Sequence, residues 1–184
     1  LKEEMSVTIK GHVGYYCGGM NQKANICIEG NAGTGLGENM MSGIIHVKGN
    51  TSQSAGATAH GGTIIIDGNA SSRCGISMKG VDIIVKGSVG HMSAFMAQAG
   101  TLMICGDAGD ALGDSIYETV IYIAGKPKSL GVDCIEKKVT KNDFKKIENL
   151  IKIGNIKKLK PHNFKKFGSA RKLYNFNIDN VSEY

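Results

Sequence analysis

Residues 26–50 read ICIEGNAGTGLGENMMSGIIHVKGN, and this stretch decides the fold. It opens with two aliphatic residues separated by one position, followed by Gly30 and Asn31. The same arrangement returns 19 residues later, where it ends at Gly49 and Asn50. An alternating aliphatic pair closed by glycine is typical of a short strand with one buried face, followed by a turn. A fixed repeat of this unit predicts a stack of strands.

The 19-residue interval extends over most of the chain. Glycine closes an aliphatic pair at seven equally spaced positions, the first glycine series: Gly11, Gly30, Gly49, Gly68, Gly87, Gly106 and Gly125. A second glycine series lies seven residues after the first, with Ala94 in one position and these residues in the others: Gly18, Gly37, Gly56, Gly75 and Gly113. Glycine fills only about one position in seven of the whole chain, so two such series are not coincidental.

A unit with one short strand cannot bury its apolar face alone, and stacking solves this problem. Successive coils about 4.8 Å apart would pair their strands in parallel and place the aliphatic pairs inside. We therefore predict an all-β fold, a single-stranded parallel β-helix of seven 19-residue coils over residues 1–126. Right-handed winding is the hand expected for parallel crossovers.

Both glycine series are expected to mark corners at which the backbone adopts positive φ. Three glycines of the first series are followed by asparagine, at Asn31, Asn50 and Asn69. Asparagine suits tight corners, and stacked amides can bond from coil to coil. We favour this structural role over a ligand-binding role for the three side chains.

The C-terminal region, residues 127–184, differs from the repeat in charge and pattern. Residues 126–184 carry 15 basic and 6 acidic residues, whereas residues 1–125 carry 7 and 10. Thr140 and the apolar spacing after it predict an amphipathic helix over about residues 141–153, packed on the last coil or on a partner.

Basic and aromatic residues interleave in the tail after this helix. An arm that wraps an acidic partner subunit and an RNA-binding tail would both look like this, and we favour the partner arm. The candidate docking residues are Phe164, Phe167, Arg171 and Tyr174.

Residues that could carry catalysis or bind metal do not fall at matching positions of the repeat. The histidines occupy different coil positions, which disfavours a metal cluster. Asp107, Asp110 and Asp114 crowd one coil, but no acidic residue stacks beneath Asp107, so we interpret them as a solvated corner. No GxGxxG motif follows a strand and opens a helix. We expect no catalytic, cofactor or metal site on this chain.

Composition also bears on location. No apolar run is long enough to span a membrane. Five cysteines without a CxxC pair favour a reducing cytoplasm. The start shows no charged stretch followed by an apolar block, so no signal peptide is expected, and Leu1 in place of Met is consistent with a natural start further upstream.

The pattern strand-G-N-x-G-x-G-x-G, in IEGNAGTGLGENMMSG (residues 28–43), resembles the C-terminal β-helix (GXGXG) domain of glutamate synthase large subunits. The next coil, VKGNTSQSAGATAHGG (residues 47–62), does so as well, and the resemblance covers about residues 5–126. The segment FKKFGSARKLYNF (residues 164–176) is similar to the ending of stand-alone small subunits, including those of N-methylglutamate synthase-type complexes. Ala94 departs from the glycine pattern and weakens one corner.

The resemblance implies a structural subunit without activity of its own. It would hold together a class II glutamine amidotransferase-like subunit and a glutamate-synthase-like subunit that carries FMN and an iron–sulfur cluster. The same β-helix occurs in the C subunit of formylmethanofuran dehydrogenase, which is the main alternative. A carbohydrate-active β-helix enzyme and an RNA-binding solenoid remain further alternatives.

Overall fold

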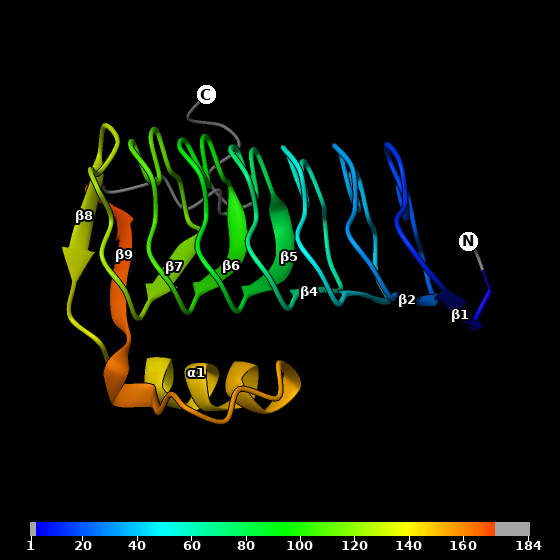
Figure 1. Ribbon diagram of the computed structural model, residues 1–184. Coiled ribbons are helices and arrows are strands. Elements are labelled where there is room, and N and C mark those ends of the chain that lie inside the picture. Colours follow the sequence, from blue (N-terminus) through cyan, green and yellow to red (C-terminus); the bar gives the residue numbers. More distant parts are fainter. Residues whose placement is uncertain (1–2, 172–184) are drawn as a thin grey trace, which may run out of the picture.

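The computed structural model describes residues 3–171 and shows a β-solenoid with one α-helix along its side (Figure 1). Seven short strands form the stack: β1 (Ser6–Ile9), β2 (Asn25–Ile28), β3 (Ile44–Val47), β4 (Thr63–Ile66), β5 (Lys79–Val85), β6 (Ala99–Ile104) and β7 (Val120–Ile123). The chain then forms β8 (Cys134–Lys137), α1 (Lys141–Ile153), the short 3-10 helix η1 (Pro161–Asn163) and β9 (Lys165–Ser169).

The stack has the register that the repeat predicts. Strands β1 to β7 pair in parallel in chain order, and partners lie 19 residues apart, from Ser6 with Asn25 to Ile104 with Ile123. The register shifts once, between Lys79 and Asp82 in β5. A second line of parallel bridges, starting with Val13 and Ala32, joins the coils on another side. The predicted solenoid is confirmed for about six turns, whereas its right hand and the full count of seven coils stay predictions.

The aliphatic pairs face inward and form one continuous core. From β2 to β7 both members of each pair are buried, for example Ile45 and Val47 in β3. Leu36, Met40 and Met78 fill the interior between the strands and the opposite side of the coils. Because each coil repeats the same inward positions, similar side chains stack in columns along the rod.

The second glycine series has the predicted backbone, and the first does not. Gly18, Gly37, Gly56, Gly75 and Gly113 have φ between 65° and 70°, and Ala94 takes the same conformation with φ of 58°. In the first series only Gly11 has a positive φ, of 118°. The expectation of positive-φ corners at the other six positions was therefore wrong.

Close contact between coils explains the glycines of the first series instead. At Gly30, Gly49, Gly68, Gly87, Gly106 and Gly125 an added Cβ would come within 3.0 Å of an oxygen atom of the preceding coil. The backbone N–H of each glycine from Gly49 to Gly125 donates to the carbonyl oxygen of the glycine one coil before, at 2.9 to 3.1 Å. These positions need glycine because the backbones approach too closely for any side chain.

The positions that follow these glycines form a hydrogen-bonded column. The six side chains from His12 to Asp107 each accept a hydrogen bond from the backbone N–H of the equivalent residue in the next coil, at 2.8 to 3.0 Å. The column runs through His12, Asn31, Asn50, Asn69, Ser88, Asp107 and Lys126. The three asparagines thus lie in one structural array, in which a side chain bonds a backbone group rather than another amide.

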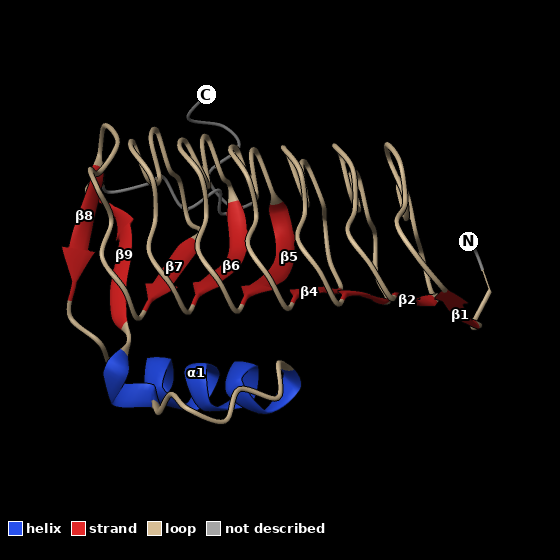
Figure 2. Cartoon of the chain, viewed as in Figure 1, coloured by secondary structure: helices blue, strands red, loops and turns tan. Residues whose placement is uncertain are grey.

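Helix α1 occupies the residues predicted for it. Thr140 caps its start in a capping box with Asp143, and Gly154 closes it. The helix does not sit on the last coil alone: it runs along the side of the stack (Figure 2). Its Ile147 and Leu150 pack, together with Phe164, against the outward side chains of strands β4 to β7.

The C-terminal tail contributes a strand that closes one end of the stack. Strand β9 lies between β7 and β8 and pairs antiparallel with both. Its Phe167 faces Ile121 of β7 and joins the central core, where it is 3% exposed. Phe164 is equally buried. The prediction that these two phenylalanines dock a partner was wrong, because both pack inside their own chain.

Candidate functional site

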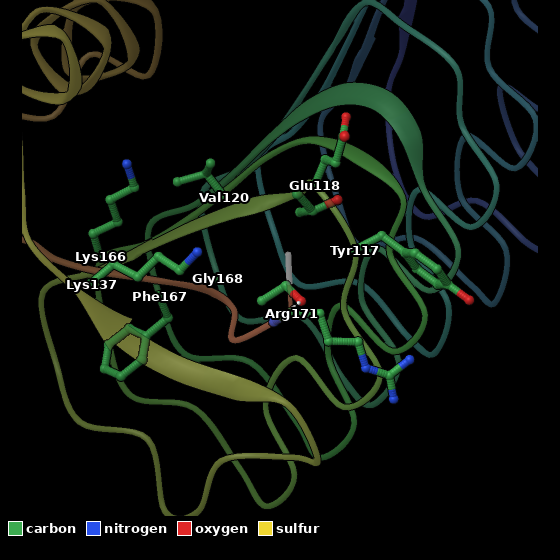
Figure 3. Close-up of a pocket in the computed structure, with 10 residues that line it drawn as sticks. Tyr117, Glu118, Val120, Lys137, Lys166, Phe167, Gly168 and Arg171 are labelled. Atoms are coloured by element: carbon green, nitrogen blue, oxygen red, sulfur yellow. Dashed lines mark hydrogen bonds between the residues drawn. The ribbon is translucent and has the colours of Figure 1, made fainter. Parts of the chain in front are cut away.

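A pocket of about 280 Å³ opens where the tail strand meets the last coil (Figure 3). Residues 117–120, which lead into β7, line one side, and Lys137 of β8 lines another. Strand β9 and Arg171 complete the wall. Two of the predicted docking residues, Phe167 and Arg171, border this pocket, whereas Tyr174 lies outside the described residues.

The cationic side chains around the pocket are largely engaged elsewhere in the fold. The ammonium group of Lys166 bonds the Asp143 carboxylate, away from the pocket, at 2.8 and 3.0 Å. The guanidinium of Arg171 forms an ion pair with Asp133. Glu118 is an exposed acidic residue on the rim. The pocket therefore combines local salt bridges with apolar wall atoms, and it does not present a nucleophile beside a base.

Behind the pocket, a buried polar junction ties the last strand, the helix and the tail together. Asp143 accepts hydrogen bonds from the Tyr122 hydroxyl at 2.6 Å and from Thr140 at its backbone N–H and hydroxyl. With Lys166, these contacts bring β7, the start of α1 and β9 to one carboxylate. Asp143 is only 6% exposed, so the junction is a structural anchor.

The junction shifts the ionisation of both acidic members. Burial alone would raise the pKa of Asp143, but the hydrogen bonds from Lys166, Thr140 and Tyr122 outweigh burial and hold that pKa well below its usual value. Burial, and then the hydrogen bond to Asp143, raise the pKa of the Tyr122 hydroxyl. The fold therefore keeps the carboxylate charged and the phenol neutral at neutral pH.

We predict that Asp143→Asn lowers the free energy of unfolding at pH 7 by about 2 kcal/mol, the range for lost charged hydrogen bonds. Because the pKa of Asp143 is depressed in the folded state, its stabilisation is complete above the unfolded pKa of about 3.9 and is lost as pH falls further. Urea unfolding at several pH values should show wild type and variant converging below about pH 4. Asp110→Asn, at an exposed carboxylate paired with Lys128, is the matched control and should remain close to wild type. Equal stability of Asp143→Asn and wild type at pH 7 would contradict the anchoring role.

The cysteines and histidines of the described residues show no sign of a reactive thiol or a metal site. Burial raises the pKa of Cys74 to about 12 and the pKa values of Cys105 and Cys134 to about 11. Such thiols stay protonated and unreactive at neutral pH. Within residues 3–171, no three His, Cys, Asp or Glu side chains form a group that could hold a metal ion. His46 bonds Asp67 at 2.9 Å beside Lys86.

The three aspartates of the crowded coil make separate local contacts. Asp107 accepts the backbone N–H of Lys126 and belongs to the hydrogen-bonded column. Asp110 pairs with Lys128, and Asp114 accepts a hydrogen bond from the neighbouring Ser115 hydroxyl. The carboxylates therefore stabilise corners of the coil, which fits the structural interpretation made from sequence.

At the opposite end of the stack, the described residues leave a strand edge and several apolar side chains exposed. Among the described residues, β1 pairs only with β2, so its other edge has no partner strand. Large apolar side chains are exposed around it, and Tyr15, Tyr16 and Met20 are 77%, 62% and 70% exposed. A hollow of about 260 Å³ lies there, lined in part by Val7, Ile9 and Cys17.

The helix-covered side carries a signal that sequence reasoning missed. At the middle outward position of the strands, the first three coils have Thr8, Cys27 and His46. The next four have apolar or aromatic residues: Ile65, Ile84, Met103 and Tyr122. This change to apolar outward residues predicts that another segment of the chain, or a partner, covers the outer face of the stack from the fourth strand onward.

Comparison with known proteins identifies the family. Protein GlxC of Rhizobium meliloti (strain 1021) is 65% identical over 178 residues, which make up 97% of this chain and 78% of that protein. No protein-family model matches the chain. In the described part of the chain, no helix has both the length and the apolar character needed to cross a bilayer. At this identity and coverage, the chain belongs to the GlxC protein family.

Proposed function

We propose that this chain is a non-catalytic scaffold subunit of a glutamate-synthase-like complex. The observation that carries the proposal is the stacked solenoid itself, whose 19-residue glycine pattern resembles the β-helix domain of glutamate synthase large subunits. Such a rod presents flat, rigid sides of parallel strands on which other subunits can dock. Membership of the GlxC family supports the same proposal.

The chemistry-bearing side chains also support a structural role. Asp107 bonds a neighbouring coil, Asp143 anchors the helix and the tail, and Cys74 is a buried, protonated thiol. These groups are used to build the rod. Under this proposal the catalytic chemistry belongs to other chains.

The proposed partners are a class II glutamine amidotransferase-like subunit and a glutamate-synthase-like subunit that holds FMN and an iron–sulfur cluster. The chain itself would hold no cofactor, and neither membranes nor nucleic acids would be among its partners. We further propose a right-handed winding of all seven coils and a cytoplasmic location. The five cysteines form no disulfide with one another in this fold, and such cysteines are common in proteins of a reducing compartment.

Purification of the tagged chain from its native extract tests the proposal, with mass spectrometry of the partners and an absorption spectrum of the eluate. Recovery of an amidotransferase-like chain with a flavin and iron–sulfur chain is the expected result. Nuclease treatment and a high-salt wash should leave these partners bound, whereas nucleic acid held by charge would be lost. A chain recovered alone and colourless would contradict the scaffold role. Recovery of molybdenum or tungsten enzyme subunits would favour the formylmethanofuran dehydrogenase-like alternative.

A further inference from the structure

Helix α1 and the segments on either side of it carry most of the basic residues of the described chain. Residues 126–171 contain 14 Lys or Arg and 4 Asp or Glu, whereas residues 1–125 contain 7 and 10. Repulsion between like charges opposes a compact fold, so this imbalance is unfavourable for the chain on its own. It becomes favourable when a negatively charged surface lies against it.

The acidic residues of this region are already neutralised within the fold. Each of the four forms an ion pair with a basic side chain of the same region. Lys128 and Lys146 pair with Asp110 and Asp82 of the coils. Six of the remaining lysines are exposed and have no ion-pair partner within residues 3–171, and we call them the lysine surface: Lys138, Lys141, Lys145, Lys157, Lys158 and Lys160.

The helix holds one row of this surface away from the stack. Lys141 and Lys145 are four residues apart, so they lie on the same face of α1. The helix buries Ile147 and Leu150 against the stack, and its lysine face is therefore turned toward solvent. With 13 residues, α1 presents this face over about 20 Å.

The segment after the helix adds a second row. Beyond Gly154 the chain turns back and runs along α1 to η1 (Figure 1). Ile156 and Leu159 of this segment pack against the apolar cluster under the helix. The three lysines between and after them are exposed. Packing on both sides of each turn thus fixes the two rows on one rigid unit.

The aromatic and arginine side chains that nucleic acids require are not presented here. Phe164 and Phe167 interleave with the lysines in the sequence, but each is 3% exposed, so neither can stack on a base. Arg171 is the one arginine among the 14 basic residues, and it pairs with Asp133. A membrane-binding helix needs an exposed apolar face, whereas that of α1 is packed on the stack. These observations favour carboxylates on a folded protein.

We propose that the lysine surface is the docking site for an acidic, carboxylate-rich face of a partner protein subunit. This inference rests on the proposed scaffold function and specifies which part of the chain a partner binds. The lysines steer and orient the partner. Phe144 and Ile153 of the same helix are each 40% exposed and supply apolar contacts that salt does not weaken. Because Asp143 ties α1 to β7 and β9, a partner bound here is held rigidly on the rod.

Zero-length cross-linking of the native complex tests the contact directly, because a carbodiimide joins a lysine amine only to a carboxylate that touches it. Mass spectrometry should find peptides of the lysine surface, above all those with Lys141, Lys145, Lys157 or Lys158, joined to Asp or Glu of a partner subunit. Lys23, an exposed lysine of the coils, is the control and should not be joined to the same carboxylates. Cross-links to that partner only from other parts of the chain would overturn the proposal.

Charge reversal tests the same surface in the full chain. The variant with Lys141, Lys145, Lys157 and Lys158 all changed to Glu should recover at least tenfold less of the cross-linked partner than wild type at low ionic strength. The matched variant with Arg at the four positions keeps the charges and should recover wild-type amounts. All four side chains are exposed, so both variants should melt like wild type.

The outcomes separate this inference from the function on which it rests. If wild type recovers the proposed subunits and the reversed variant recovers them equally well, the scaffold role stands and the lysine surface is not the docking site. If nuclease treatment removes the partner from wild type, nucleic acid binds the lysines and the proposal is overturned. A wild-type chain recovered without any partner would overturn both.

Discussion

Phe167→Ala is expected to lower the free energy of unfolding by about 3 to 5 kcal/mol, the range for removing a buried phenylalanine side chain. Phe167 lies opposite Ile121 and closes the central core at the C-terminal end of the stack. Its loss leaves a cavity against the last coil and loosens β9, the strand that separates β7 from β8. For a chain of this size, the melting temperature should fall by roughly 10 °C.

Urea unfolding followed by circular dichroism measures this effect, with Phe144→Ala as the matched control. Phe144 lies on α1 and is 40% exposed, so the same change of residue removes much less buried surface there. The control should lose less than about 1 kcal/mol, in part because alanine is the better helix former. If both variants lost the same free energy of unfolding, Phe167 would not be the residue that closes the end of the core.

The repeat made most of the fold predictable from sequence. A fixed interval of 19 residues places each coil directly above the last, so strand positions, register and inward residues follow from one repeat. The helix was predictable for a different reason: Thr140 and Asp143 form a capping box, and Gly154 ends the apolar spacing. In both cases the structure is encoded locally or by strict repetition.

The closing strand was not predictable, because its pairing is neither local nor repeated. The segment around Lys166 reads as a basic tail, yet Lys166 neutralises the buried Asp143. Phe167 is buried because β9 lies between β7 and β8, two strands that are far from β9 in the sequence. The pattern of a single sequence identifies apolar residues, but it does not tell whether such a residue packs within its own chain or against a partner. A docking surface was therefore predicted at Phe164 and Phe167, which pack inside their own chain.

Gly49→Ala tests the corrected role of the first glycine series and should lower the free energy of unfolding by about 3 kcal/mol, near the upper end for overpacking. Its φ is not positive, so alanine would be tolerated there if backbone conformation were the constraint. The added methyl group would instead lie 2.7 Å from the Gly30 carbonyl oxygen and closer still to Asn31 Oδ1. Both oxygens accept hydrogen bonds from the coil of Gly49, so neither can move away without breaking the ladder.

Gly14→Ala is the matched control for this prediction, because a Cβ at Gly14 would have no atom within 4 Å and the residue has no positive φ. It should leave stability unchanged or raise it slightly, since alanine reduces the conformational entropy of the unfolded chain. Thermal unfolding of both variants beside wild type distinguishes two explanations for the repeat. A large loss for Gly49→Ala alone assigns the first series to close stacking of coils. If Gly49→Ala melted like wild type, some other constraint would have to account for glycine at every nineteenth residue.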